Sequence, residues 1–139
     1  MESPIWIDQK VVKVIHKRQL DQHGGLSGIR DTGLLESSLA KPINCYVYSA
    51  PQPSWAELAA CYAFGIARNH PFFDGNKRVA YVVCLLFLRL HGYRVVAQDE
   101  EKYRTFLSMA EGTTPEDELA CWIDAHLFES KTVINKNLW

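Results

Sequence analysis

The 139-residue chain is long enough for one domain with a full hydrophobic core and too short for two comfortable ones. Its 47% hydrophobic and 22% charged residues are typical of a soluble globular protein and exclude an extended disordered chain. The formal net charge of -1 argues against a general nucleic-acid coat or a membrane-surface peptide. We therefore expect no direct nucleic-acid binding and no membrane association.

The cysteines and the apolar runs predict a protein of the reducing cytoplasm. Cys45, Cys61, Cys84 and Cys121 lie far apart and form no Cys-x-x-Cys pair. Three of them fall within apolar helical patterns, so we expect buried free thiols and neither disulfides nor a zinc site. No charged-then-apolar leader opens the chain. The longest apolar run, residues 79–90, is shorter than the ~20 residues of a membrane span.

The first part of the chain predicts two capped helices and one extended segment. Asp8 is expected to cap a first helix that a pair of glycines ends. After a glycine-rich connection, residues 24–30, Asp31 is expected to cap a second helix that Pro42 ends. Residues 43–53 carry two tyrosines, two prolines and a valine, which predicts a short extended flap.

The middle of the chain predicts two long helices joined by a short connection. Ser54 and Glu57 form a capping box that opens the third helix, and Pro71 closes it. The fourth helix, 76–91, is apolar around almost its whole circumference, which is typical of a helix at the centre of a bundle. A brief extended stretch is expected at 93–97.

The last part predicts two shorter helices and a tail. Asp99 is expected to cap the fifth helix and Thr114 to begin the sixth. We expect residues 129–139 to form a flexible tail. The predicted fold is all-α: residues 1–139 form a single compact domain with its core at about 5–128. About six helices surround the central apolar helix, with a short extended flap.

The connection between the third and fourth helices, residues 70–78, reads His-Pro-Phe-Phe-Asp-Gly-Asn-Lys-Arg. Two phenylalanines among so many polar residues predict a loop that its aromatic side chains hold while its polar groups face a ligand. The backbone amides of Gly75, Asn76 and Lys77 fall in the first turn of the next helix, where unpaired N–H groups attract anions. Lys77 and Arg78 add positive charge, so the segment predicts phosphate binding.

The other side chains of this loop have separate expected roles. Phe72 is expected to anchor the loop in the core. Asp74 would repel a bare phosphate, which makes it a better candidate for a magnesium ligand. His70 is a candidate general base for an incoming hydroxyl group.

At these residues the chain resembles the Fic/Doc family, and the family motif stands here as residues 70–78. Lys77, which stands where AMP-transferring Fic enzymes carry Gly, indicates the death-on-curing (Doc) toxin branch. The stretches 24–31 and 34–37 point to the same branch. The resemblance covers roughly residues 5–128 and implies the compact helical domain already expected.

The resemblance also implies roles for single residues. His70 would deprotonate the target hydroxyl, and Lys77 and Arg78 would complete the catalytic set while holding phosphates. Gly75 and Asn76 would form the anion hole, and the carboxylate of the loop would bind magnesium.

The predicted flap has an implied role in docking the target. Tyr46, Val47 and Tyr48 would line up a segment of the target protein by strand addition.

One departure from the AMP-transferring members bears on the reaction. Those enzymes end the motif with a second Arg that clamps the distal phosphate, and the matching position here is Tyr81. Together with Lys77, this change implies a reversed nucleotide that presents its γ-phosphate. The resemblance then implies a toxin that acts as a protein kinase with ATP and Mg²⁺. It would phosphorylate a threonine of a translation factor, elongation factor Tu, and arrest translation.

The control of such a toxin is expected to come from a separate antitoxin. Thr32, Glu36 and Ser37 come close to the inhibitory (Ser/Thr)-x-x-x-Glu-(Gly/Asn) motif of Fic proteins, but a plain helix start is the stronger interpretation. The implied partner is an antitoxin protein that folds on binding.

Three other hypotheses about the function remain open at this point. The chain could transfer AMP to a protein hydroxyl, or it could be a catalytically inactive module that binds a partner. A bundle that binds a metal through His70, His91 and Cys84 is the weakest of the three, because Cys84 is more simply a core residue.

Overall fold

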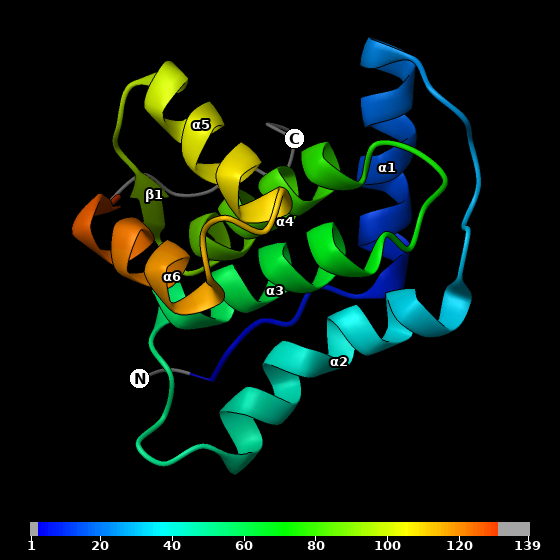
Figure 1. The fold of residues 1–139 in the computed structure, drawn as a ribbon. Coiled ribbons are helices and arrows are strands. Elements are labelled where there is room, and N and C mark those ends of the chain that lie inside the picture. The colour runs from blue at the N-terminus through cyan, green and yellow to red at the C-terminus, as the bar shows by residue number, and fades with distance from the viewer. Residues whose placement is uncertain (1–2, 131–139) are drawn as a thin grey trace.

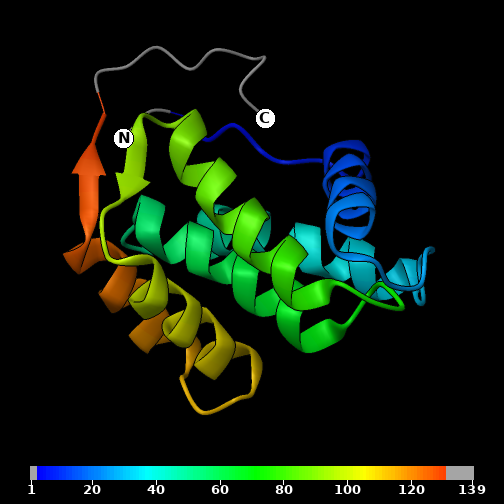
Figure 2. The same ribbon diagram turned by 90° about the horizontal axis from the view of Figure 1, so that it is seen from above.

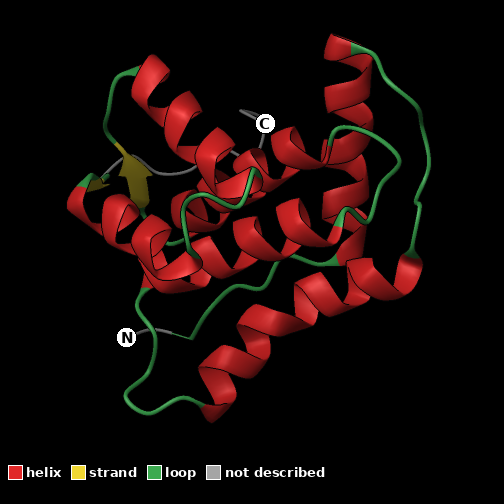
Figure 3. Cartoon of the chain, in the orientation of Figure 1, coloured by secondary structure: helices red, strands yellow, loops and turns green. Residues whose placement is uncertain are grey.

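The computed structural model describes residues 3–130 of the chain. Helices make up almost all of the regular structure, as Figure 3 shows. The elements in chain order are α1 (Gln9–His23), α2 (Thr32–Tyr48), α3 (Trp55–Asn69), α4 (Asn76–Leu90), β1 (Tyr93–Val95), α5 (Asp99–Ala110), α6 (Glu116–Ala125) and β2 (Leu127–Glu129) (Figure 1). The all-α prediction is confirmed, while the tail predicted for 129–139 lies almost wholly outside the described residues.

Local capping signals determine where several helices begin. The Asp8 side chain accepts a hydrogen bond from the Val11 amide, and the Asp31 side chain accepts one from the Leu34 amide. Ser54 and the third residue of α3 form the predicted capping box. Each of these contacts pairs an amide that would otherwise lack a partner at a helix start, so the three predicted starts are confirmed.

Helices α3 and α4 form the centre of the bundle together, and Figure 2 shows them side by side. Helix α3 packs against α2, α4, α5 and α6, whereas α4 packs against α1, α3, α5 and β1. Small residues such as Ala59, Ala63 and Gly65 are buried along α3 and allow its neighbours to approach closely. The prediction of a single central helix at 76–91 was therefore incomplete, because the apolar pattern of α4 marks only half of this centre.

The predicted extended flap is wrong. Helix α2 continues through Pro42 to Tyr48, so Tyr46, Val47 and Tyr48 form its last turn. A proline inside a helix costs about 3 kcal/mol, but Pro42 is buried with Leu35 and Leu39 on the face that packs against α3. We attribute the continuation of the helix to this packing.

The extended structure lies instead at the other end of the chain. Strands β1 and β2 form an antiparallel pair in which Tyr93 faces Glu129 and Arg94 faces Phe128. The short extended stretch at 93–97 was expected, but β2 was not. The Arg94 guanidinium carbon lies 5.7 Å from the centroid of the Phe128 ring, a cross-strand cation–π contact.

The cysteines only partly follow the prediction. All four are free thiols, but only Cys61 and Cys84 are buried, while Cys121 is exposed and Cys45 is half-buried. Burial raises the pKa of Cys61 to about 12. Among residues 3–130, no helix combines the length and the apolar character needed to cross a bilayer.

The buried hydrogen bond of the Tyr62 hydroxyl allows a direct test of how the core contributes to stability. It accepts a hydrogen bond from the Ile7 amide at 3.0 Å, and both residues are buried. Tyr62→Phe leaves this amide without a partner, so we expect a loss of about 1–3 kcal/mol in the free energy of unfolding, measured by urea denaturation. Tyr48→Phe is the matched control, because the Tyr48 side chain is 83% exposed. Equal stability of the two variants would contradict this role.

Alkaline pH tests the same contact in a second way. Burial raises the pKa of Tyr62 to about 12 from an ordinary value of 10.0. Above pH 10 the unfolded chain loses this proton more readily than the folded protein, so the stability that the protonated hydroxyl contributes falls as pH rises. We expect the stability advantage of the wild type over Tyr62→Phe to narrow as the pH rises from about 10 to about 12. A pH-independent difference in urea denaturation would refute this.

Candidate functional site

The predicted phosphate loop joins α3 to α4 through two residues in the left-handed region. His70 closes α3 with φ 50°, and Gly75 precedes α4 with φ 78°. His70 is the one non-glycine residue with positive φ among residues 3–130. Such a conformation costs a non-glycine residue about 1–2 kcal/mol, and surrounding contacts must therefore hold it.

The side chain of Asn76 closes this loop on itself. Its Oδ1 accepts a hydrogen bond from the Phe72 amide at 2.9 Å, and its Nδ2 donates to the Phe72 carbonyl, also at 2.9 Å. Asn76 is 7% exposed and Phe72 is 1% exposed, so both contacts lie inside the protein. The Asn76 side chain therefore shapes the loop, and only its backbone amide is available to a ligand.

The glycine-rich connection between α1 and α2 holds the loop from outside. The amides of Arg30 and Asp31 both donate to the Pro71 carbonyl, at 2.7 and 3.0 Å, and the Phe73 amide donates to the Gly28 carbonyl at 3.3 Å. A short antiparallel bridge forms where these two segments meet. Segments about 40 residues apart in the chain are thereby fixed against each other.

Arg30 adds a contact that we did not predict from the sequence. Its guanidinium group donates to the His70 carbonyl at 2.7 Å and to the Asn69 carbonyl at 2.9 Å. These carbonyls lie at the negative end of α3, where a cation is favourable. Arg30 therefore fixes the backbone that carries the candidate base. The sequence showed only an arginine at the end of a glycine-rich stretch.

His16 is a second residue that we did not predict. It is 6% exposed, its ring stacks on Phe72 with centroids 3.9 Å apart, and its Nε2 lies 2.9 Å from the Asp74 carbonyl oxygen. The available signal was a histidine on the buried face of the first helix, close to Val12 and Ile15.

Three backbone amides at the start of α4 remain open to a ligand. The first helical hydrogen bond runs from the Val79 amide to the Gly75 carbonyl at 3.0 Å. The amides of Asn76, Lys77 and Arg78 precede it and have no acceptor within the described part of the chain. Together with the helix dipole, they form a site that favours an anion.

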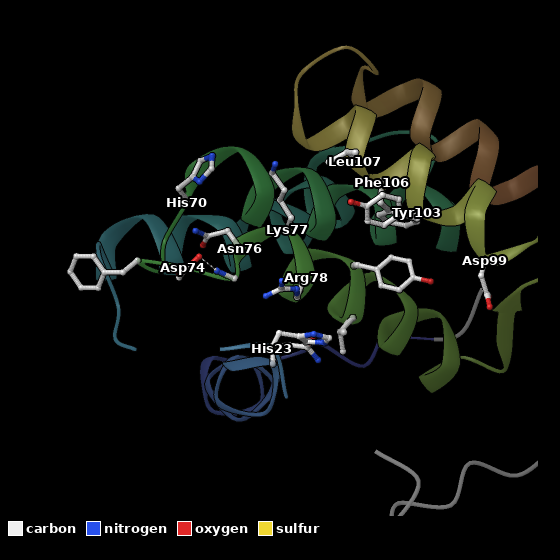
Figure 4. A pocket seen from close by; sticks show the side chains of 15 residues that line it. His23, His70, Asp74, Asn76, Lys77, Arg78, Asp99, Tyr103, Phe106 and Leu107 are labelled. Atoms are coloured by element: carbon white, nitrogen blue, oxygen red, sulfur yellow. Dashed lines mark hydrogen bonds between the residues drawn. The ribbon is translucent and has the colours of Figure 1, made fainter. Parts of the chain in front are cut away.

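These amides face a cavity of about 790 Å³, within the size range of small-molecule sites. One half of the cavity contains His70, Asp74 and the first turn of α4. The other half is lined by Tyr81, Tyr103, Phe106 and Leu107, with Asp99 at its edge. Figure 4 shows Lys77 and Arg78 leaving α4 in different directions within this space.

The aromatic half of the cavity comes from α4 and α5. The rings of Tyr81 and Phe106 meet edge to face with centroids 4.8 Å apart. Burial raises the pKa of Tyr81, and the nearby Asp99 carboxylate raises it further. The Tyr81 hydroxyl therefore stays neutral at physiological pH and can donate a hydrogen bond.

The carboxylate of Asp74 fits a magnesium ligand. Asp74 is exposed in the cavity, where Oδ2 accepts from the Leu26 amide at 3.2 Å and Oδ1 accepts from the Gly75 amide at 3.1 Å. Each carboxylate oxygen keeps a free lone pair. Magnesium commonly uses one or two protein carboxylates together with water and substrate phosphates. Such a site needs no cluster of three protein ligands, and residues 3–130 contain none.

Other candidate residues do not meet at the cavity. The last turn of α2, with Tyr46, Val47 and Tyr48, lies at the far end of α2 from the loop between α3 and α4 (Figure 1). Glu36 is exposed on α2 and does not line the cavity.

The alternative metal site at His70, His91 and Cys84 is also wrong. His70 precedes α4 and His91 follows it, so the two histidines are separated by the length of the helix. The described residues contain no group of three potential metal ligands.

Comparisons with known proteins agree with the resemblance. The model of the Fic/DOC family matches residues 6–88, which span α1 to α4 and contain the whole loop. The toxin Doc of Mycolicibacterium smegmatis is 37% identical over 75 residues, which cover 53% of this chain and 57% of the relative. The protein kinase doc of Escherichia phage P1 is 34% identical over 86 residues, which cover 62% of this chain and 68% of the relative. The match thus spans less than two thirds of the first relative, while the family match covers more than half of this chain: the protein belongs to the Fic/DOC family.

Proposed function

We propose that this protein is a Doc-type toxin that acts as a protein kinase. It transfers the γ-phosphate of ATP to a threonine hydroxyl of a translation factor such as elongation factor Tu, and thereby arrests translation. The observation that carries the proposal is the set of unpaired amides at the start of α4, in one cavity with His70, Lys77 and Arg78. Membership of the Fic/DOC family and the two Doc relatives support it.

The phosphates of ATP fit the loop half of the cavity. The amides of Asn76, Lys77 and Arg78 would donate to phosphate oxygens, and the two cationic side chains would balance the negative charge. Gly75 bears no side chain that would keep a phosphate oxygen away from the backbone. Asp74 would hold a magnesium ion, which when bound would supply positive charge against the phosphates.

His70 would act as the general base. Its ring would take the proton of the target hydroxyl, whose oxygen then forms a bond to the γ-phosphorus. The bond between the γ-phosphorus and the bridging oxygen breaks, and ADP leaves. Arg30 supports this role indirectly, because it holds the His70 carbonyl and therefore the backbone that carries the ring.

The aromatic half of the cavity would take the nucleoside. Tyr103 is 66% exposed and offers a ring face for stacking, while Tyr81 and Phe106 form the wall behind it. Tyr103 and Phe106 lie outside the matched range of the family model.

AMP transfer to a protein hydroxyl is the second candidate, because it uses the same fold and base. Two features favour the kinase over it. Tyr81 lines the cavity where AMP-transferring members carry a second arginine, so no cation stands there to clamp the distal phosphate. Lys77 also places a long side chain where those enzymes carry glycine. A catalytically inactive, partner-binding module is the third candidate, and variants of His70 separate it from the other two.

The relative named toxin Doc supports a role for an antitoxin. We propose an antitoxin protein that folds on binding as the partner, because Glu36 does not reach the cavity and so cannot block it from within.

The position of the radiolabel decides between the two reactions. We expect ATP labelled at the γ-phosphate to label a purified translation factor, and ATP labelled at the α-phosphate to leave it unlabelled. His70→Ala is expected to lower the transfer rate by about 10²–10⁴-fold, because the general base is lost. His126→Ala, a substitution at the C-terminal cap of α6 and away from the cavity, is the matched control.

Label from the α position on the target would overturn the kinase in favour of AMP transfer. Full toxicity of folded His70→Ala in cells would favour the partner-binding module.

Magnesium dependence tests the role of Asp74. We expect Asp74→Asn to require a higher magnesium concentration for half-maximal transfer, because the amide carries no negative charge for the cation. Asp124→Asn, an exposed position on α6, should leave this concentration unchanged. Initial rates over a series of magnesium concentrations measure both, and identical curves for the two variants would exclude Asp74 as a ligand.

A further inference from the structure

A buried histidine on α1 makes a directional contact with the phosphate loop. The Nε2 of His16 lies 2.9 Å from the Asp74 carbonyl oxygen. A carbonyl oxygen can only accept a hydrogen bond, so Nε2 must carry the proton and donate. His16 does not line the cavity, and it can act on a ligand only through the loop.

This contact determines which way one peptide group of the loop faces. The Asp74–Gly75 peptide is trans, so the Asp74 carbonyl and the Gly75 N–H point in opposite directions. The carbonyl points to His16 beneath the loop, and the N–H therefore points to the cavity side. The Gly75 amide donates there to the Asp74 carboxylate, which itself lies in the cavity.

The reverse orientation of this peptide would be unfavourable for phosphate. A rotated peptide would turn the Asp74 carbonyl oxygen, with its negative partial charge, toward the anion. Gly75 adopts φ 78° and bears no Cβ, so its own sterics restrict the backbone least of all residues. Besides the Gly75 amide bond to the Asp74 carboxylate, the contact from His16 outside the loop selects this orientation.

Packing against Phe72 and Gly75 fixes the position of the His16 ring. Its ring stacks on Phe72 with an interplanar angle of 12°. A Cβ atom built on Gly75 would lie 3.7 Å from His16 Cδ2, so the ring lies directly against the peptide.

We propose that His16 is a positioning residue of the phosphate site. Its Nε2–H holds the Asp74–Gly75 peptide so that the Asp74 carbonyl oxygen faces away from the open amides of α4, while the Gly75 amide stays on the Asp74 carboxylate. This inference rests on the proposed function, because it assigns a support to the same nucleotide site.

Two substitutions separate the hydrogen bond from the packing of the ring. His16→Gln keeps an N–H donor near the position of Nε2 but loses the aromatic ring. His16→Phe keeps a ring that can stack on Phe72 but has no donor. A packing role predicts that His16→Phe is the milder change, whereas the positioning role predicts the opposite.

The experiment measures ATP affinity in the presence of magnesium by calorimetry, together with the thermal midpoint of each protein. We expect His16→Gln to bind within about 3-fold of the wild type and His16→Phe to bind about 10-fold or more weakly. Unchanged affinity in folded His16→Phe, or equal losses in both variants, would overturn the inference. If His16→Phe does not fold, His16→Leu replaces it as the donor-free variant.

A second measurement keeps this inference separate from the proposed function. The three-bond coupling between the amide and α protons of Gly75, which reports its φ angle, is compared in the ATP-free wild type and variants by NMR. We expect it to change in the donor-free variant and to stay at its wild-type value in His16→Gln. If the wild type binds no ATP, the proposed function fails, and the Gly75 coupling alone decides on His16. An unchanged coupling in the donor-free variant would exclude the contact as the factor that orients the peptide.

Discussion

The site depends on one constraint: the start of α4 must stay uncovered while the loop before it is held from beneath. A free helix start usually finds a side-chain cap, as α1, α2 and α3 do here. Helix α4 has no such cap, because Gly75 precedes it and the Asn76 side chain turns inward to Phe72. The donors that a cap would satisfy are left for a ligand. A local loss of helix stability is thus the basis of the proposed phosphate binding.

Long-range contacts compensate for this local cost. The left-handed conformation of His70 is unfavourable in isolation, yet Arg30 binds the carbonyl of this same residue. The segment that carries Arg30 also pairs with Pro71 and Phe73. Helix α1 contributes His16 from below. Two separate parts of the chain, the connection that carries Arg30 and helix α1, therefore hold a loop of a few residues, as expected where strain is kept at a candidate functional position.

The two halves of the cavity differ in their relation to the family. The loop and the amides of α4 lie inside the range that the Fic/DOC model matches, whereas the aromatic wall from α5 lies outside it. Binding a phosphate group through the backbone requires N–H donors in fixed positions, and these depend on one specific loop conformation. The proposed contact with a nucleoside requires only an aromatic surface, and many arrangements of side chains can provide one. This difference explains why the motif was visible in the sequence and the wall was not.

The sequence by itself determined the helix starts at Asp8, Asp31 and Ser54, the loop that ends at Gly75, and the family. These features are local, because a cap or a turn involves residues only a few positions apart. The tertiary structure alone decided that α2 passes through Pro42, that β2 pairs with β1, and that Arg30 and His16 support the loop. Each of these depends on packing or hydrogen bonds between segments distant in the chain. The free energy gained from these contacts outweighs the local conformational preferences of the residues. No local pattern records such a partner, so only the folded chain reveals it.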